Sequence, residues 1–463
     1  MTDRKKWSET LTYTKKSVYE VREDAAILQA MDYARDYAAF LDAAKTEREA
    51  VREGVRLAQQ HGFRPYHFGD RIVPGDKLYV NNQGKSLYLF VAGTEDISNG
   101  IRIAAAHVDS PRLDLKQCPL YEDGGMSFFK THYYGGIRKY QWVTIPLALH
   151  GVVIRKDGSA LDIVIGEDDS DPVFYINDLL PHLAHEADRK PLGEAIPGEK
   201  LNVLIGSRPF DQSGEADSVK LYTLYLLHEK YGITEEDFLS AELSFVPAAR
   251  ARDIGFDRSM IGAYGHDDRV CAYPALTAIL ACDAPVHTLM CVLADKEEIG
   301  SEGVSGMKSA LMSDLIDAVS LSLGGNSAAV RAASRCLSAD VSAAFDPNFA
   351  DAFEKRNSAL LCAGVVLTKY TGARGKSGTN DASAEYIGWL RGVMENAGVV
   401  WQSGELGKVD GGGGGTVAKF IAQLNIETVD LGVPVISMHA PIEVISKVDL
   451  YEAYRAFLAF YQA

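Results

Sequence analysis

The spacing of apolar and polar residues changes along the chain, and each change predicts a different element. Residues 25–60 place apolar side chains at helical intervals, as at Ile27 and Met31. Residues 77–91 instead alternate as two strands around a turn at Asn82-Gln83-Gly84. The N-terminal part therefore predicts helices followed by the first strands of a sheet.

Residues 113–246 show a different pattern of apolar and polar residues. Short alternating runs are separated by turn signals, and one helical stretch covers residues 218–230. Beyond this stretch, strand-like and helix-like runs again follow one another, as in a sheet covered by helices. We therefore expect an α/β domain made of residues 1–112 and 247–463, interrupted by a β-rich insertion of residues 113–246.

Side chains that can bind metal ions stand where strands are expected to end. The apolar runs 101–106, 289–294 and 336–341 each lead to such residues, and sites in α/β sheets gather at the carboxyl ends of strands. The candidates are His107 with Asp109, Asp267 with Asp268, Glu297 with Glu298, Asp340, and His439. Together they suffice for two divalent ions about 3.5–4 Å apart with one shared carboxylate. Nitrogen and oxygen ligands without cysteine suit zinc, and also manganese or cobalt.

The pair Glu297 and Glu298 lies in VLADKEEIGSEG, residues 292–303, directly after a buried strand. Neighbours on an extended chain point to opposite sides, so the two carboxylates are expected to meet different surroundings. One can bind a cation while the other takes a proton from water, as a metal-dependent hydrolase requires. Considered alone, the pair is better explained as a charged, solvated loop, and the other candidate residues are what favour the metal-dependent hydrolase.

Two histidine spacings receive different interpretations. His107 and Asp109 share a face of an extended segment, so Asp109 can accept the second N–H of the imidazole and orient it as a ligand. The stretch HLAHE at residues 182–186 contains neither of the two zincin orders and is interpreted as a surface helix.

Composition and charge narrow the class of protein. A chain of 463 residues suggests two or three domains. The 47 Lys and Arg against 63 Asp and Glu give a net charge of −16, which argues against a nucleic-acid partner. No secretory signal is visible and no apolar run reaches the ~20 residues that span a bilayer, so we expect a cytoplasmic protein without membrane contact. The six cysteines form no Cys-x-x-Cys pair and are expected to be reduced.

Five motifs, taken as a set, resemble those of one peptidase family. They are HVDSP at 107–111, the Asp-Asp pair at 267–268, DKEEIGS at 295–301, SADVSAAFDPN at 338–348 and SMH at 437–439. Their order over the whole chain resembles the M18 metallo-aminopeptidases, the aspartyl aminopeptidase family, and looks closer to its bacterial branch. The resemblance implies a phosphorylase/hydrolase-like catalytic domain with two metal ions. It also implies that the inserted β-rich domain forms dimers, which assemble into a tetrahedral dodecamer.

The same resemblance implies a role for each candidate residue. The implied metal ligands are His107, Asp267, Glu298, Asp340 and His439. Asp267 would bridge the ions, with His107 and Asp340 completing one site. Glu298 and His439 would complete the other.

The remaining acidic residues would act beside these ligands. Glu297 would be the general base, and Asp109 would orient or tune the metal site, whereas Asp268 would lie outside the ligand set. The implied substrates are peptides with free N-termini, because the metals would hold the α-amine.

Two regions depart from the eukaryotic members of that family. Those members have Trp and His after Tyr-Gly-Gly, and a neighbouring subunit lends that His to the active site, whereas this chain reads IRKYQW at residues 137–142. Residues 369–380 and the glycine run 411–415 also differ, which leaves the preference for acidic N-terminal residues open. Arg138 or Lys139 could supply a positive charge near the site. Both residues are equally well explained as solvated residues of a hairpin.

Two further features allow two interpretations each. The glycine run 411–415 either lets backbone approach a substrate closely or forms a plain flexible loop, and Thr416 could cap the next helix. His266 either reaches the site or is packed and hydrogen-bonded elsewhere.

Three functions fit these residues. The first is a cytoplasmic dinuclear aminopeptidase that removes N-terminal residues, among them acidic ones, from peptides. The second is another amidohydrolase on the same scaffold, such as a deacetylase or a carboxypeptidase. The third is a non-catalytic oligomeric binding protein with a decayed site. Acetylation of a test peptide separates the first from the second, and Glu297→Gln tests the third.

Overall fold

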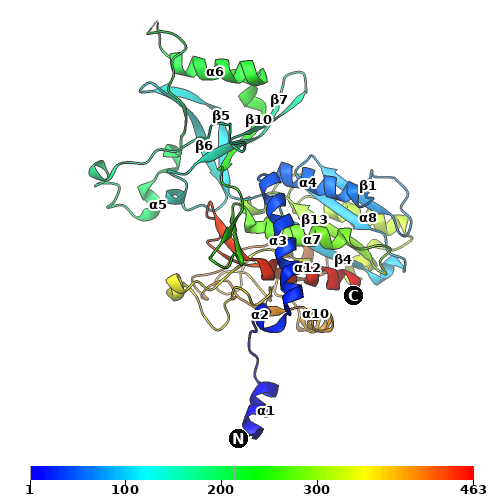
Figure 1. Cartoon of the computed structure of the whole chain (residues 1–463). Coiled ribbons are helices and arrows are strands. Elements are labelled where there is room, and N and C mark those ends of the chain that lie inside the picture. The colour runs from blue at the N-terminus through cyan, green and yellow to red at the C-terminus, as the bar shows by residue number, and fades with distance from the viewer. Residues whose placement is uncertain (1, 213) are drawn as a thin grey trace.

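Three β-sheets organise the chain, of which the computed structural model describes residues 2–212 and 214–463 (Figure 1). The largest sheet has nine strands. In spatial order they are β1 (Arg64–Pro65), β2 (Lys77–Asn82), β3 (Ser86–Val91), β13 (Thr288–Ala294), β4 (Ile101–His107), β14 (Arg335–Ser338), β18 (Glu427–Gly432), β16 (Val365–Thr368) and β17 (Trp401–Ser403). The two strands predicted over residues 77–91 are confirmed as β2 and β3, an antiparallel pair.

Helices cover both faces of this sheet, because successive side chains on its central strands point to opposite faces. On β4, Ala104 and Ala106 pack in one hydrophobic cluster, whereas Ile103 and Ala105 pack in another. Helices on the first face are α3 (Asp24–Ala43), α4 (Glu47–Gln60), α7 (His266–Leu280), α10 (Ala384–Asn396) and α12 (Lys447–Gln462). Those on the second are α8 (Leu311–Ser322), α9 (Ser327–Ala333) and α11 (Ala418–Ala422). This layering confirms the predicted α/β class.

The helical pattern predicted over residues 25–60 forms two helices. α3 ends at Ala43 and α4 begins at Glu47. Between them the Thr46 hydroxyl accepts a hydrogen bond from the Glu49 amide, and the Glu49 carboxylate accepts one from the Thr46 amide. This capping box starts a new helix, because it satisfies backbone donors that a helix start leaves free.

A six-stranded antiparallel sheet forms a separate lobe, with α6 (Ser218–Tyr231) beside it (Figure 1). Its strands in spatial order are β8 (Ala160–Ile165), β7 (Leu147–Ile154), β10 (Ala241–Pro247), β5 (Arg112–Asp123), β6 (Met126–Tyr134) and β9 (Val203–Gly206). Phe129, Trp142 and Phe245 belong to a hydrophobic cluster of its own. The alternating runs between residues 113 and 246 thus form one sheet.

Buried charges join this lobe to the helices around the larger sheet. Lys45 Nζ lies 2.6 Å from Glu167 Oε1. His150 on β7 contacts Glu49 of α4 at 2.8 Å through Nδ1 and Glu167 at 3.0 Å through Nε2. Because Lys45 and the His150 side chain are nearly inaccessible to solvent, these pairs fix how the two parts meet.

The third sheet has five short strands and lies next to the site described below. They are β11 (Arg252–Ile254), β12 (Met260–Ala263), β20 (Glu443–Ser446), β19 (Pro434–Ile436) and β15 (Ser342–Ala343). The remaining short helices are α1 (Thr2–Leu11), α2 (Val18–Val21) and α5 (Leu192–Ala195). None of the described helices combines the length and apolar character that crossing a bilayer requires.

Two predicted elements differ in the structure. The strand predicted over residues 336–341 ends at Ser338, because the chain then leaves the large sheet and pairs β15 with β19. Asp340 therefore lies in a loop. The helix predicted at residues 182–186 is only a 3-10 turn (Pro181–Leu183).

Candidate metal centre

Three neighbouring strands bring candidate ligands to one edge of the nine-stranded sheet. β4 runs parallel to β13 on one side and to β14 on the other, and His107 is level with Ala294. His107 ends β4, while Glu297 and Glu298 follow β13 and Asp340 follows β14. The carboxyl ends of adjacent parallel strands thus converge, which explains why residues distant in sequence meet here.

His107 is buried and has different partners on its two ring nitrogens. Its Nδ1 lies 2.9 Å from the Asp109 backbone oxygen and 3.3 Å from Asp109 Oδ1. Its Nε2 lies 3.2 Å from Asp267 Oδ1 and 3.8 Å from Asp340 Oδ1. If Nδ1–H donates to the Asp109 carbonyl, the Nε2 lone pair faces the carboxylates, as a metal-ligating histidine requires. Asp109 thus contacts the imidazole as predicted, with its backbone oxygen closer than its carboxylate.

Asp267 lies between two imidazoles. It stands at the start of α7, which follows β12 of the third sheet. While Oδ1 faces His107, Oδ2 lies 3.1 Å from His439 Nε2. That nitrogen is also 3.5 Å from Glu298 Oε1, and His439 Nδ1 lies 2.8 Å from the Gly136 carbonyl oxygen. Each oxygen of one carboxylate therefore faces a different imidazole.

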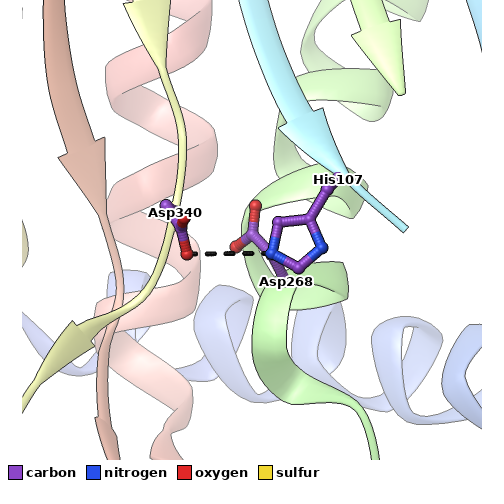
Figure 2. A group of neighbouring side chains, drawn as sticks. All are labelled: His107, Asp268 and Asp340. Carbon is purple, nitrogen blue, oxygen red and sulfur yellow. Dashed lines mark ion pairs between the residues drawn. The ribbon is translucent and has the colours of Figure 1, made fainter. Parts of the chain in front are cut away.

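Asp268 also reaches the cluster. One ligand atom each from His107, Asp268 and Asp340 lie within 4.8 Å of one another, and the same holds for His107, Asp267 and Glu298. Figure 2 shows the first of these groups with its ion pair between His107 and Asp340. Among the described residues, neither carboxylate oxygen of Asp268 has a hydrogen-bond partner. Asp268 was predicted to lie outside the ligand set, whereas the structure brings it beside two candidate ligands.

Glu297 and Glu298 lie in a 3-10 turn (Glu297–Ile299), so the predicted extended chain at this position was wrong. The chain turns here because Asp109 holds it. The Glu297 amide donates to Asp109 Oδ1 at 3.1 Å, and the Glu298 amide donates to Oδ2 at 3.2 Å. The Tyr134 hydroxyl donates to the same Oδ2 at 2.8 Å. The two glutamates still have different neighbours, because Glu298 lies 3.5 Å from His439 Nε2, although both line the cavity described below.

Glu443 is a site residue that the sequence analysis missed. Its Oε2 accepts a hydrogen bond from the Asp267 amide at 3.0 Å, and its Oε1 accepts one from the His439 amide at 2.7 Å. Burial raises the pKa of Glu443 to about 7, and the nearby Asp267 adds to the shift. The sequence contained one signal for Glu443: it is an acidic residue at the start of a buried strand, four positions after His439.

Negative charge accumulates in this cluster beyond what the protein itself balances. Asp267 Oδ1 and Glu298 Oε1 are buried without a hydrogen-bond partner in the described part of the chain. Burial raises the pKa of Glu297 to about 8, a shift that His107 opposes and Asp340 increases. Burial together with Asp267 also raises the pKa of Glu298. Buried carboxylates crowded beside two imidazoles fit divalent cations, which add positive charge to the cluster, and this donor set suits zinc.

A cavity of about 440 Å³ opens onto the cluster. Glu297, Asp340 and residues 413–415 form part of its wall, so the glycine run brings backbone close to the cavity. Lys419 also lines it and forms no ion pair with any described carboxylate. Its ammonium lies 4.9 Å from the ring centre of Phe420. The cavity thus combines an anionic metal cluster with one ammonium group.

The two basic residues considered at residues 137–142 do not line this cavity. Arg138 is exposed, and its guanidinium carbon lies 4.9 Å from the ring centre of Tyr140. Lys139 is half-buried at the start of a 3-10 turn (Lys139–Gln141). Within one chain, therefore, the cationic group of the cavity comes from α11 rather than from this segment.

His266 is a packed residue outside the cluster. Its Nδ1 lies 2.9 Å from the Tyr37 hydroxyl, and its Nε2 lies 3.2 Å from the Ile261 carbonyl oxygen. Burial lowers the pKa of His266 to about 3. The packed interpretation of this histidine is the one that the structure supports.

Comparison with protein families identifies the family of this chain. The family described as "Aminopeptidase I zinc metalloprotease (M18)" matches residues 40–461. The chain is a member of the M18 aminopeptidase family. This M18 chain is 48% identical over 453 residues to a protein named "Probable M18 family aminopeptidase 1" from Clostridium acetobutylicum, covering 96% of this chain and 97% of that one. It is 44% identical over 432 residues to the protein of that name from Thermotoga maritima, covering 92% and 94% of the two chains.

Solved structures of M18 proteins share the fold. The crystal structure of the M18 aminopeptidase from Thermotoga maritima has a TM-score of 0.92 at 42% identity and covers 97% of this chain and 100% of that one. Aminopeptidase I from Clostridium acetobutylicum has a TM-score of 0.91 at 43% identity, with 97% and 99% covered. The mApe1 dodecamer of yeast has a TM-score of 0.76 at 20% identity, covers 93% and 96%, and shows the common fold alone.

These matches confirm the expected activity class. The M18 chain is a metal-dependent aminopeptidase, and its family is one of zinc metalloproteases. The resemblance to the bacterial branch is likewise confirmed, because the relatives compared above at 44–48% identity are bacterial.

Proposed function

We propose that this aminopeptidase works with two divalent ions held by His107, Asp267, Glu298, Asp340 and His439. The position of Asp267 supports this set most directly, because its Oδ1 lies 3.2 Å from one imidazole and its Oδ2 lies 3.1 Å from the other. A carboxylate so placed can be shared by two ions. His107 and Asp340 complete one site, and Glu298 and His439 complete the other. Zinc suits these ligands, and manganese or cobalt could replace it.

When bound, the ions polarise the scissile carbonyl, make water more acidic and hold the free α-amine of the peptide. Glu297 is the general base: it takes the proton of the attacking water and passes it to the leaving amine nitrogen. Asp109 positions this step, because its carboxylate holds the amides of Glu297 and Glu298 and also contacts His107. Asp268 lies beside His107 and Asp340 without binding an ion.

Peptides with free N-termini are the proposed substrates, and acidic N-terminal residues are included among them. Lys419 supports this inclusion, because an ammonium without a carboxylate partner among the described residues can pair with an Asp or Glu side chain in the cavity. The glycines at 413–415 leave room for the substrate beside the backbone.

The chain is proposed to assemble through residues 113–246, while residues 1–112 and 247–463 form the catalytic domain. Dimers built in this way would form a tetrahedral dodecamer. Support comes from apolar side chains exposed on α6, including Leu221 and Leu226 at 51% and 50% exposure. A cytoplasmic location is proposed on the basis of six free cysteines, since disulfides persist in oxidising compartments.

The experiment that tests this function uses short peptides that differ only at the N-terminal residue, each with a free or an acetylated N-terminus. The protein is loaded separately with zinc, manganese or cobalt. We expect cleavage confined to free N-termini, because acetylation removes the amine that the metals hold. Cleavage of acetylated peptides would instead favour a deacetylase or carboxypeptidase on this scaffold. No cleavage with any metal would favour a binding role.

A further inference from the structure

The end of strand β6 belongs to the six-stranded lobe, yet it touches the metal centre. The Tyr134 hydroxyl donates to Asp109 Oδ2 at 2.8 Å. The next residue, Gly135, lies against a proposed ligand: a Cβ at Gly135 would be 3.1 Å from Glu298 Oε2. Gly135 has a φ of +74°, a backbone conformation that suits glycine.

The following residue contacts a second proposed ligand. The Gly136 carbonyl oxygen lies 2.8 Å from His439 Nδ1. In the neutral imidazole, an Nδ1–H that donates to this carbonyl leaves the Nε2 lone pair free, and Nε2 faces Asp267 Oδ2 at 3.1 Å. The carbonyl therefore selects the tautomer in which Nε2 can bind a cation.

We infer that residues 134–136 are a positioning segment through which the six-stranded lobe orients the metal ligands Glu298 and His439. This inference rests on the ligand set proposed above. It assigns no contact with substrate to the segment, which acts only through the side chains that it touches. The metal centre is then completed by backbone and a hydroxyl group from outside the nine-stranded and five-stranded sheets.

Tyr134, which ties this segment to Asp109, is itself held in place by neighbouring side chains. The Arg112 guanidinium carbon lies 4.1 Å from the ring centre of Tyr134, and Arg112 pairs with Glu47 at 3.0 Å and with Asp114 at 2.7 Å. Asp109 in turn receives hydrogen bonds from the Glu297 and Glu298 amides as well as from Tyr134. A displacement of the β6 end would therefore move the turn that carries Glu298.

Glycine at position 136 is required by space rather than by backbone conformation. Gly136 does not adopt a left-handed φ, so alanine is compatible with its backbone. A Cβ there would nevertheless stand 3.2 Å from His439 Nδ1 and 3.6 Å from Cε1, so the imidazole would have to shift. Gly136→Ala thus perturbs one ligand with little other change.

The test measures zinc affinity of the full-length protein by competition with a chelator. Gly136→Ala keeps the carbonyl but pushes the His439 ring away from it. Because loss of an outer partner of a metal ligand typically weakens binding about 10–100-fold, we expect a weakening of up to this size. Gly193→Ala is the matched control, because a Cβ at that exposed glycine of α5 meets no atom within 4 Å. Excess zinc should restore turnover in Gly136→Ala, and the visible spectrum of its cobalt-loaded form should differ from wild type.

A second variant tests the hydroxyl without changing the backbone. Tyr134→Phe removes only the donor to Asp109 and should weaken zinc binding, although less than Gly136→Ala because two amides still hold Asp109. Tyr133→Phe is its control, since the neighbouring Tyr133 is 42% exposed. Thermal unfolding of the metal-free variants should match wild type.

His439→Ala separates this inference from the proposed function. If His439→Ala loses zinc while Gly136→Ala and Tyr134→Phe bind it as wild type does, the positioning role is overturned and the ligand set stands. If His439→Ala binds zinc as wild type does, the ligand set and the positioning role both fail. Equal weakening in Gly136→Ala and Gly193→Ala would also overturn the inference, because the effect would then be unspecific.

Discussion

Glu297 and Glu298 are adjacent in sequence, yet the structure gives them different surroundings. Both line the cavity, and Glu298, whose side chain is 4% exposed, lies 3.5 Å from His439 Nε2. The 3-10 turn that carries them is held by Asp109 and not by a strand partner. At the scale of the residue, this difference fits the proposed roles of Glu298 as a ligand and Glu297 as the base.

Replacement of Glu297 tests the base. We expect Glu297→Gln to lower kcat by a factor on the order of 10²–10⁴, because the amide cannot accept the proton of water. The metal content, measured by elemental analysis, should equal that of wild type because Glu297 is not a proposed ligand. A metal-free Glu297→Gln protein would contradict the assignment.

Replacement of Asp267 tests the shared carboxylate. Asp267→Ala should lose both ions, since each imidazole faces a different oxygen of this side chain. Asp268→Ala serves as the comparison and should keep two ions per chain. Elemental analysis of both variants after dialysis distinguishes these outcomes. Loss of an ion from Asp268→Ala would make Asp268 a ligand.

Replacement of Lys419 tests the preference for acidic residues. Lys419→Met should reduce kcat/KM for peptides with N-terminal Asp or Glu about 10–100-fold, which corresponds to a charged hydrogen bond of about 1.5–3 kcal/mol. Peptides with N-terminal Ala or Leu should be cleaved at nearly the wild-type rate. Lys408→Met, at an exposed lysine of a nearby loop, is the control. Equal losses for acidic and apolar peptides would remove Lys419 from substrate recognition.

At the scale of the element, α4 and β7 meet through His150. Burial opposes its charged form, but hydrogen bonds to Glu167 and Glu49 raise the pKa of His150 above its ordinary value of about 6.5. A raised folded-state pKa stabilises the protein fully below the unfolded value, and this stability is lost as pH rises through the folded value. The contact between the six-stranded lobe and the helices around the larger sheet should therefore weaken at alkaline pH.

His150→Gln should remove this part of the pH dependence and lower the free energy of unfolding at pH 6 by about 1.5–3 kcal/mol. Thermal unfolding between pH 6 and 9 measures both effects. The exposed His228 of α6 provides the control variant, His228→Gln. An unchanged pH profile in His150→Gln would show that the buried pairs do not depend on a charged imidazole.

At the scale of the whole molecule, the six-stranded lobe stands apart from the layered α/β body (Figure 1). Its exposed apolar residues on α6 include Leu221 and Leu226. Residues 134–136 join the same lobe to the metal centre. The lobe proposed to mediate assembly is therefore also the one that contacts the proposed metal centre.

Light scattering tests the assembly. We expect a particle of twelve chains of 50.4 kDa each. Leu226→Asp on α6 should produce smaller species, because a buried unpaired carboxylate is unfavourable at an apolar contact. Leu321→Asp, at an 80% exposed position of α8, should leave the mass unchanged. If the wild-type particle has the mass of two chains, the protein is a dimer and the dodecamer is excluded.

Much of the fold could be predicted from the sequence alone, because helices and strands follow from the local periodicity of apolar residues. The strands β2, β3 and β13 and the helix α6 lie where apolar spacing placed them or nearly so. Of the candidate ligands, His107, Glu298 and Asp340 follow parallel strands of the nine-stranded sheet, as their position after apolar runs predicted. Asp267 and His439 instead follow β12 and β19 of the five-stranded sheet, and the role of all five as ligands stays a prediction. The sequence missed Glu443 and misjudged the backbone at Glu297, since neither depends on local spacing.

What the sequence by itself determined is the order of elements and the chemical nature of the donors, because both are properties of neighbouring residues. Only the tertiary structure decided that each oxygen of Asp267 faces a different imidazole and that Gly136 holds His439. Gly136 and His439 are 303 residues apart in the chain. Their contact exists only when the six-stranded lobe packs against the larger sheets, so no local pattern could reveal it.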